Sequence, residues 1–227
     1  MQASSRSAAV RLQAELRDER VTPASFSAAL QEVAPQDREA WLDLLWDIDE
    51  LPPDDPDLPR GCVPYLPCAV ATVLEAVQQV AVTSDDVFVD VGSGAGRAAL
   101  LVHLETGASC IGLEIQPSLV ATAQARADWL KLSRIRFVEG DAADMIRSIA
   151  IGTVFFLYCP FSGDRLRRLL DGLEDVARTR PIRVCCIDMP LLERPWLARL
   201  PPTSSSVDVY QSTLQQTECV RSAARSP

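Results

Sequence analysis

The sequence predicts an α/β protein built on a doubly wound, mostly parallel sheet. From residue 86 to residue 188, short apolar runs alternate with longer helical stretches, and this alternation is typical of parallel strands joined by helices. The first apolar run, 86–91, stops abruptly in the turn Gly92-Ser93-Gly94-Ala95-Gly96, and a helix opens from it. A strand, a glycine turn and a helix in this order hold nucleotide-like ligands at the carboxyl edge of open sheets.

Two helices are expected ahead of the sheet, at residues 8–20 and 25–50. Apolar residues recur in both with helical spacing, and either Thr22-Pro23 or Ser25 suits the start of the second helix. The stretch 47–57 holds six acids and three prolines, so a helix is excluded there. It reads either as a solvated linker or as an acidic rim that attracts a cationic substrate such as an amine.

The elements of the sheet region follow a helix at 69–80, and their alternation implies right-handed crossovers. After Pro190 the pattern weakens, and Val207–Tyr210 with Ser212–Val220 is the expected antiparallel hairpin that completes seven strands. In chain order the expected elements are strand 86–91, helix 95–106, strand 109–115, helix 117–131, strand 134–139, a short helix at 142–149, strand 152–158, helix 163–178 and strand 181–188.

Length and composition limit the class of protein. A chain of 227 residues suits one α/β domain at 61–220, preceded by a helical segment with its linker at 1–60 and followed by a frayed tail at 221–227. The net charge of −9 disfavours nucleic acid as a partner. No apolar run approaches the roughly 18 residues of a membrane span, and no signal-peptide pattern is present, so we expect a cytoplasmic protein without a membrane partner.

Cysteine usage points to reduced thiols. The seven cysteines are odd in number, several lie in strand-like apolar runs, and no pair has C-x-x-C spacing. Buried thiols therefore explain them better than disulfides, and no metal site is expected. Cys185 and Cys186 in particular are expected in the core.

The spacing of the glycine turn indicates its ligand. A dinucleotide site needs G-x-G-x-x-G, whereas this turn is G-x-G-x-G with Asp90 two residues ahead of it. Glycine lets the backbone take positive φ and approach a ligand closely. We expect the turn's amides to face the ligand and Asp90 to accept from an amino group of the ligand, or else to cap the turn.

Acids stand at the ends of two further strands. Glu114 lies 18 residues after Gly96, within reach of ribose hydroxyls on a ligand seated at the turn, although a solvated strand-end glutamate is the plainer alternative. Asp141, in Glu139-Gly140-Asp141-Ala142, follows the third strand. It accepts either from a ligand or, as a helix N-cap, from the backbone.

Together these features resemble the class I S-adenosylmethionine (SAM) methyltransferases, a Rossmann-like family. Val89-Asp90-Val91-Gly92-Ser93-Gly94 is similar to their first motif, D-L-G-S-G-x-G. The resemblance implies SAM as cofactor, with Asp90 toward its amino group, Glu114 on both ribose hydroxyls and Asp141 on the adenine amino group. The implied cofactor-binding residues are Tyr65, Asp90, Gly92, Ser93, Gly94, Gly96, Glu114, Ile115, Asp141 and Ala142.

Within that family the chain looks most similar to protein-lysine methyltransferases outside the SET group. Tyr65-Leu66-Pro67-Cys68 resembles their Y-V-P-[ST] segment, and Gly112-Leu113-Glu114-Ile115 resembles their G-[VY]-E-[IL]. The chain departs from their N-P-P-[FY]-like motif after the fourth strand. There it carries Tyr158, Cys159, Pro160 and Phe161, the expected catalytic residues, with Tyr158 at the asparagine position. Backbone carbonyls there, or the Tyr158 hydroxyl, would have to orient the nucleophile.

Other chemistry-bearing residues receive plainer interpretations. Tyr65 either covers the carboxylate end of the cofactor or only packs. His103, in the middle of a helix, is expected to be structural, and Arg165, Arg167 and Arg168 to form a solvated helix face. Asp188, at the end of the last parallel strand, is a candidate base or amine-pairing acid.

The sequence therefore predicts a SAM-dependent methyltransferase whose N-terminal helical segment caps the substrate side. An amine is the preferred acceptor, with protein lysine first, because the resemblance and the acidic approach both favour a cation. Two alternatives stay open: a small-molecule N- or O-methyltransferase of a biosynthetic pathway, and a non-catalytic SAM-binding partner protein. Oligomeric state is not predicted.

Overall fold

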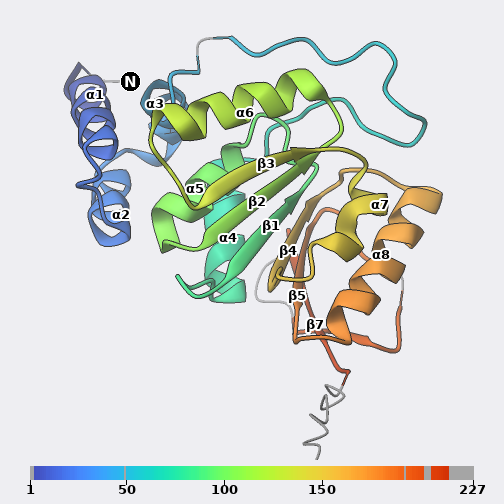
Figure 1. Cartoon of the computed structure of the whole chain (residues 1–227). Helices are drawn as coiled ribbons and strands as arrows, with labels where there is room; N and C mark the ends of the chain where they lie inside the picture. The colour runs from blue at the N-terminus through green and yellow to red at the C-terminus, as the bar shows by residue number, and fades with distance from the viewer. Residues whose placement is uncertain (1–2, 49, 192, 202–205, 215–227) are drawn as a thin grey trace, which may run out of the picture.

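A seven-stranded sheet of order β3-β2-β1-β4-β5-β7-β6 forms the centre of the molecule (Figure 1). The computed structural model describes residues 3–48, 50–191, 193–201 and 206–214. The first five strands are parallel, and β7 pairs antiparallel with both β5 and β6. The strands are β1 (Val87–Val91), β2 (Ser109–Glu114), β3 (Ile135–Glu139), β4 (Val154–Tyr158), β5 (Arg183–Ile187), β6 (Leu197–Arg199) and β7 (Val207–Ser212).

Helices cover both faces of the sheet, which confirms the doubly wound α/β class. Successive residues of a strand point to opposite faces. Phe88 of β1 accordingly joins the apolar core beneath α4, α5 and α6, whereas Val89 joins the core beneath α7 and α8. The helices that follow the N-terminal segment are α4 (Val70–Val80), α5 (Arg97–Thr106), α6 (Pro117–Trp129), α7 (Ala142–Met145) with the 3₁₀ turn η2 (Ile146–Ser148), and α8 (Gly163–Ala177).

The chain reverses direction across the sheet between β1 and β4. From β1 it proceeds to β2 and β3 on one side, and from β4 to β5 on the other. The loops after β1 and β4 therefore diverge to opposite faces and leave a crevice at the carboxyl edge of the strands. In open α/β sheets this crevice is where ligands bind.

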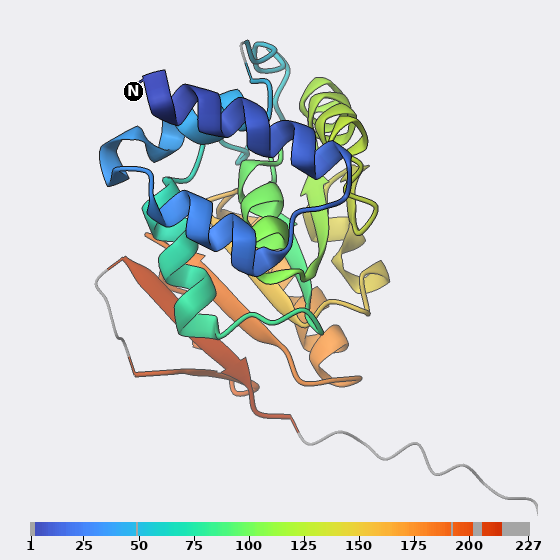
Figure 2. The ribbon, with the colours of Figure 1, turned by 90° about the vertical axis from the view of Figure 1, so that its left-hand side faces the viewer.

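The N-terminal segment folds as three helices packed beside α5. They are α1 (Ala3–Arg17), α2 (Pro23–Gln31) and α3 (Arg38–Leu45), the last preceded by the 3₁₀ turn η1 (Pro35–Asp37) (Figure 2). Thr22 and Ser25 form a reciprocal capping box at the start of α2. The single helix expected at 25–50 is broken before Pro35, because the residue ahead of a proline avoids the helical region; Ala34 has ψ of 137°.

Arg97, the residue that follows the glycine turn, joins these helices to the sheet domain. Its side chain is nearly buried, forms ion pairs with Glu39 and Asp43 of α3, and lies with its guanidinium carbon 5.7 Å from the centre of the Trp46 ring. Glu39 also accepts a hydrogen bond of 2.6 Å from the backbone N–H of Val70, at the start of α4. The N-terminal helices are thus held at the first turns of both α4 and α5.

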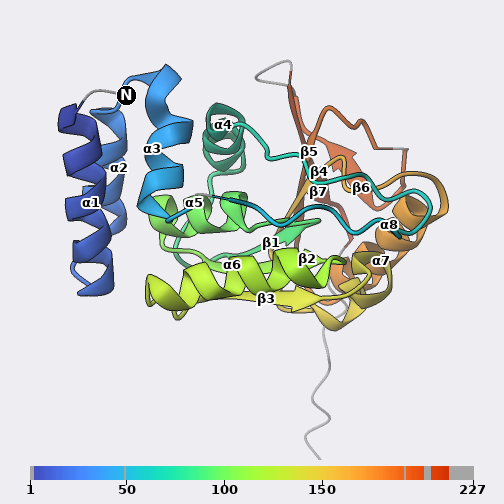
Figure 3. The same cartoon turned by 90° about the horizontal axis from the view of Figure 1, so that it is seen from above.

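The chain between α3 and α4, residues 50–69, runs as an extended strap from α3 toward α8 and back to α4 (Figures 1 and 3). It contains the acidic, proline-rich stretch that the sequence singles out. Near its turning point Cys62 forms an isolated β-bridge with Phe161, and the Arg165 side chain donates to the carbonyl of Arg60 at 3.3 Å. The strap therefore crosses the carboxyl edge of the sheet.

The expected hairpin at the end of the sheet is wrong in its second strand. β7 begins at Val207 as expected, but its antiparallel partners are β5 and the short β6, which precedes it in the chain. A strand of three residues carries too little pattern to be seen in a sequence. Residues 215–220 of the expected partner and the tail 221–227 lie outside the described residues.

Among the helices of the described residues, none has both the length and the apolar character needed to cross a membrane.

Gly112 of β2 gives a test of how closely β2 packs beside the glycine turn. A Cβ added there would lie 2.3 Å from the Phe137 ring and 2.6 Å from the Ser93 hydroxyl oxygen. We expect Gly112→Ala to lower the free energy of unfolding by about 1–3 kcal/mol through overpacking, measured by urea denaturation. Gly112→Ala/Phe137→Leu makes room and should recover part of the loss. A single variant as stable as wild type would contradict this packing.

Candidate active site

A cavity of about 200 Å³ opens at the carboxyl edge of β1, β2 and β4, beneath the strap. Three groups of residues line it. The strap contributes Cys62, Val63, Pro64, Tyr65 and Leu66. The β1 and β2 ends contribute Gly92, Leu113, Glu114, Ile115 and Gln116, and the remaining wall is Gly140, Asp141, Ala142, Tyr158, Cys159, Pro160, Phe161 and Asp188.

The expected cofactor-binding residues divide into two sets in the structure. Gly92, Glu114, Ile115, Asp141, Ala142 and Tyr65 line the cavity. Asp90, Ser93, Gly94 and Gly96 lie directly behind this wall and do not line it. The four expected catalytic residues all line it, and so does Asp188.

The carboxylate of Glu114 binds the end of β2 to the glycine turn. Its Oε2 accepts the N–H of Gly94 at 2.8 Å, and its Oε1 accepts the N–H groups of Ile115 and Gln116 at 2.8 and 2.9 Å. The side chain is only 7% exposed, so these bonds supply the partners that a buried carboxylate requires. A carboxylate has about four acceptor positions, so a ribose hydroxyl can use the fourth, and a second one must replace the Gly94 amide.

The amides of the three glycines are bound within the chain. Those of Gly92 and Gly96 donate to backbone carbonyls, and that of Gly94 donates to Glu114. All three glycines have positive φ, which explains their residue type. Gly96 in addition packs against the ring of Phe137, where a Cβ would lie 2.5 Å from the nearest ring carbon. In this structure Gly96 thus lets α5 approach the sheet.

The ring of Tyr65 covers Gly94. A Cβ on Gly94 would lie 2.0 Å from a ring carbon of Tyr65, so only glycine permits this contact. The Tyr65 hydroxyl is buried; the backbone N–H of Ala95 approaches it, and among the described residues no acceptor takes its proton. Burial and the nearby carboxylate of Asp90 both raise the pKa of this hydroxyl, which keeps it a neutral donor.

Asp90 is a buried acid with one unsatisfied oxygen. Its side chain is 4% exposed, and its Oδ2 has no partner. Burial and the charge of Glu114 raise the pKa of Asp90 to about 7. A buried carboxylate that lacks a partner is costly, so a ligand that supplies a cation would be favoured here.

These unsatisfied groups fit the amino-acid end of SAM. Asp90 Oδ2 would accept from the ammonium of its methionine portion and the Tyr65 hydroxyl would donate to its carboxylate, although both atoms lie behind the surface of the cavity. The Ser93 hydroxyl is also buried and unpartnered, but it points toward Gly112 beneath the turn. Glu114, on the cavity wall, would bind the ribose hydroxyls. SAM supplies a methyl group already activated on a sulfonium, so the protein's work is to position an acceptor.

Asp141 caps a helix and also forms an ion pair. Its Oδ1 accepts the N–H of Ala143 at 3.1 Å, at the start of α7, and its Oδ2 pairs with Arg165 of α8. Arg165 is 17% exposed in its side chain, so the expectation of a solvated helix face is wrong for this arginine. Arg168 is half-exposed and lies near Asp141 and Asp144, and Arg167 is exposed. Asp141 Oδ2 accepts from both Arg165 and Arg168, so the acceptor position left for an adenine contact is the second one on Oδ1.

The ends of β4 and β5 bring the expected catalytic residues together. Cys159 and Asp188 both have positive φ, of 44° and 50°, which is uncommon for non-glycine residues and clusters at functional sites. The Cys159 thiol lies 3.4 Å from the carbonyl oxygen of Ile187 and so joins the two ends. Burial, followed by the charge of Asp188, raises the pKa of this thiol, so it is no ready nucleophile.

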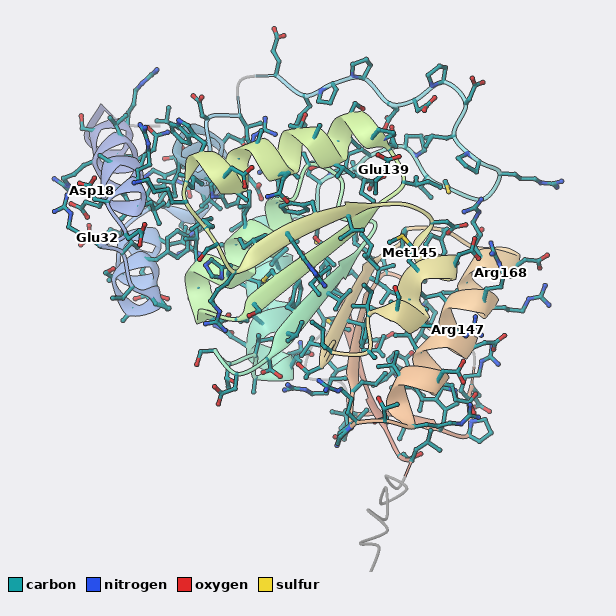
Figure 4. All side chains as sticks on the ribbon, viewed as in Figure 1. Asp18, Glu32, Glu139, Met145, Arg147 and Arg168 are labelled. Atoms are coloured by element: carbon teal, nitrogen blue, oxygen red, sulfur yellow. The ribbon has the colours of Figure 1, made fainter. Side chains whose placement is uncertain are left out.

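The N-terminal helices do not cap the substrate side, and this expectation is wrong. None of the residues that line the cavity precedes Cys62. Asp18 and Glu32, at the ends of α1 and α2, lie across the molecule from Met145 of α7 and Arg168 of α8, which flank the cavity side (Figure 4). The strap takes the place predicted for the helices. His103 lies toward the far end of α5 with its Nδ1 2.7 Å from the carbonyl oxygen of Ala108, a structural contact as expected.

The sequence did not predict a role at this site for Gln116 or Arg165. Gln116 is 3% exposed and reaches the strap, and Arg165 neutralises Asp141. Their partners are far away in sequence, so no local pattern reveals them. The position of Gln116, two residues after the strand-end acid, was the available signal.

Comparisons with known proteins point to a methyltransferase domain. Residues 82–151 match the family model described as a methyltransferase domain. An RNA methyltransferase from Salinibacter ruber, solved with S-adenosyl-L-homocysteine, is 25% identical with a TM-score of 0.50, over 65% of this chain and 92% of that one. The putative methyltransferase yhhF from Escherichia coli is 20% identical with a TM-score of 0.52, over 73% of this chain and 92% of that one.

A geranyl diphosphate C-methyltransferase from Streptomyces coelicolor, 16% identical with a TM-score of 0.46, matches over 52% of this chain, which spans only 44% of that enzyme. None of the curated proteins matches this chain in sequence. The sheet order, the glycine turn with its strand-end acids and the methyltransferase-domain match together define a class I methyltransferase domain. The protein is a SAM-dependent methyltransferase.

Replacing Asp90 by asparagine should raise the stability of the cofactor-free protein and lower its affinity for SAM. Between about pH 4, where an ordinary aspartate titrates, and about pH 7, only the folded chain keeps this proton. Stability of the cofactor-free protein should therefore fall as pH rises through that window. We expect Asp90→Asn to be more stable than wild type at pH 8 and about equal at pH 4, measured by urea denaturation.

The same variant should bind SAM more weakly by about 1.5–3 kcal/mol at pH 8, measured by calorimetry, because the ammonium loses a charged partner. Wild-type affinity for SAM in Asp90→Asn would exclude the ammonium contact. Parallel stability profiles of the two proteins from pH 4 to pH 8 would exclude the buried proton.

Proposed function

We propose that this enzyme transfers the methyl group to an amine nitrogen, with the side chain of a protein lysine as the preferred acceptor. The observation that carries the proposal is the sign of the charges around the cavity. The ionisable carboxylates that line it are Glu114, Asp141 and Asp188, and no lysine or arginine is among the lining residues. An anionic acceptor would meet only like charge there, whereas an amine would be attracted.

The acceptor end of the cavity lies between β4 and β5. Glu114 and Asp141 both have partners within the chain, which leaves Asp188 as the carboxylate available to an acceptor. Its φ of 50° is an unusual conformation at the mouth of the site. In the proposed reaction a bond from the amine nitrogen to the methyl carbon forms as the sulfur–methyl bond breaks. The proton lost from the amine passes to Asp188 or to water.

Tyr158 has the task of orienting the amine. It stands where the lysine methyltransferases that the sequence resembles carry an asparagine, and it lines the cavity, as Cys159 does. Burial raises the pKa of its hydroxyl, which therefore stays protonated and can accept from the amine N–H through its lone pairs.

Protein lysine is preferred over a free amine because of the strap. Val63 and Leu66 are 50% and 64% exposed and lie at the cavity, so they offer an apolar surface for an acceptor larger than the cavity itself. The strap also carries Asp54, Asp55 and Asp57, which would attract a basic segment around the target lysine. A small-molecule amine remains the second candidate, favoured by the modest volume of the cavity.

An RNA acceptor, as in the Salinibacter ruber enzyme, fits this chain poorly. RNA binding relies on basic residues that replace phosphate counterions. This chain has a net charge of −9, and the residues that line the cavity include three carboxylates and no lysine or arginine.

Transfer of label from tritiated-methyl SAM to a lysate of the host would test the acceptor class. We expect label in discrete protein bands, and mass spectrometry should place it on lysine. Label confined to the small-molecule fraction would move the assignment to a biosynthetic methyltransferase. Label that is removed by ribonuclease would contradict an amine of a protein altogether.

Asp188→Asn tests the carboxylate at the acceptor end. Asparagine tolerates positive φ as well as aspartate does, so the fold should be unaffected. We expect KM for the amine acceptor to rise about 10-fold or more, since a hydrogen bond to a charged group contributes about 1.5–3 kcal/mol. Affinity for S-adenosylhomocysteine, measured by calorimetry, should not change. An unchanged KM would remove Asp188 from the site.

Tyr158→Phe tests the orienting hydroxyl separately. Here kcat should fall about 10-fold or more, within the range typical of positioned catalytic groups, while cofactor affinity stays at the wild-type value. The two variants thus separate binding of the charged amine from its orientation. Unchanged turnover in Tyr158→Phe would make the residue part of the wall only.

A further inference from the structure

Gln116 is the most buried polar residue on the cavity wall, and its side chain is fully engaged by the strap. It is 3% exposed. Its Oε1 accepts the backbone N–H of Asp55 at 2.7 Å, and its Nε2 donates to Asp54 Oδ1 at 2.8 Å. The two partners lie 61 and 62 residues earlier in the chain, so this side chain links the strap to the end of β2 at this point.

The bonds of Gln116 continue to Tyr65. The same oxygen of Asp54 that accepts from Gln116 also accepts the backbone N–H of Tyr65 at 2.9 Å. The Tyr65 ring in turn lies on Gly94, whose N–H donates to Glu114, and Glu114 accepts the backbone N–H of Gln116. The contacts therefore form a closed ring from Gln116 through the strap to the glycine turn and back.

We propose that Gln116 is a positioning residue of the cofactor site, which acts by holding the strap so that Tyr65 stays against the glycine turn. Gln116 does this through Asp54 and touches no reacting atom. Tyr65 lines the cavity, as Gly92 does, and its buried hydroxyl would be a donor for the methionine carboxylate of SAM.

The amide chemistry of glutamine suits this task. One side chain must accept from a backbone N–H and donate to a carboxylate at the same time, and an amide group presents both functions in a fixed plane. Glutamate would keep the acceptor for Asp55 but would set a second carboxylate against Asp54. Because Gln116 is buried and Asp54 is half-buried, water would screen that repulsion only in part.

This closed ring of contacts also links the cofactor site to the opening through which an acceptor would enter. The strap residues that follow the clasped Asp54 include Val63, Pro64 and Leu66, which line the same cavity as Tyr65. The turning point of the strap is held separately, by the β-bridge of Cys62 with Phe161 and by the hydrogen bond from Arg165 to Arg60. Loss of the hydrogen bonds of Gln116 should thus loosen the strap at Asp54 and Tyr65 before it loosens at Cys62.

Exchanging the amide and the carboxylate between positions 116 and 54 tests the proposal. Gln116→Glu should weaken binding of S-adenosylhomocysteine at least 10-fold, measured by calorimetry, and should speed hydrogen exchange of the Tyr65 amide in the cofactor-free protein. Gln116→Glu/Asp54→Asn should restore part of both, because the Oδ1 of the new amide can accept from Tyr65 while its Nδ2 donates to the new carboxylate at position 116. The rescue is a result that a general loss of stability would not give.

Gln124→Glu is the matched control. Gln124 of α6 also donates to a carboxylate, Asp128 at 2.8 Å, and accepts from a backbone N–H, that of Phe137 at 2.9 Å, but it does not line the cavity. Its replacement should leave affinity for S-adenosylhomocysteine within about threefold of wild type, whatever it costs in stability.

Asp54→Ala, on the strap itself, covers the case in which Gln116→Glu does not fold. It removes the acceptor shared by Gln116 and Tyr65 and should lower affinity in the same way. Wild-type affinity in the single variants, or a double variant as weak as Gln116→Glu, would overturn the proposal. Because the readout is cofactor binding, these results are independent of which acceptor is methylated.

Discussion

The carboxylate of Glu114 is the contact on which the rest of the site depends. It accepts three backbone N–H groups, one from the glycine turn and two from the chain that leaves β2. Without it, the loops after β1 and β2 would lose this common partner, and the amide of Gly94 would be buried unpaired. The charge also acts at a distance, because it contributes to the raised pKa of Asp90 behind the cavity wall. One side chain thus sets both the geometry and the electrostatics of the crevice.

The negative potential of this crevice is balanced differently at each point. Glu114 is satisfied by amides, Asp141 by Arg165, and Asp90 by retaining a proton up to about pH 7. Asp188 also lines the cavity, and among the described residues no group forms a hydrogen bond or an ion pair with its side chain. A bound cation would therefore be stabilised most at the two unsatisfied acids. The sulfonium and ammonium groups of the methyl donor are cations, which agrees with a site built from acids and lacking bases along its lining.

Local pattern was sufficient to predict the five parallel strands of the sheet, and it was insufficient for β6 and for the strap. The apolar runs that became β1 to β5 each alternate with a helix, so period and spacing identify them, and the glycine turn locates the crevice. The acids and prolines of residues 47–57 also stood out, but their composition is equally typical of a solvated linker. The contacts that fix this stretch to the end of β2 join Asp54 and Asp55 to Gln116. Such pairing over more than 60 residues leaves no periodic signal, and the same holds for Arg165 and Asp141.

The N-terminal helices contribute to the site indirectly, through the two ends of the strap. Glu39 of α3 accepts the first amide of α4, where the strap ends, and pairs with Arg97, where the glycine turn ends. Gln116 holds the strap at Asp54 and Asp55, near where it leaves α3. The strap is therefore fixed on both sides of Tyr65, by groups that also fix the glycine turn. Because the same framework supports the ring of Tyr65 and the turn beneath it, a shift of the helices would move both together and preserve their contact.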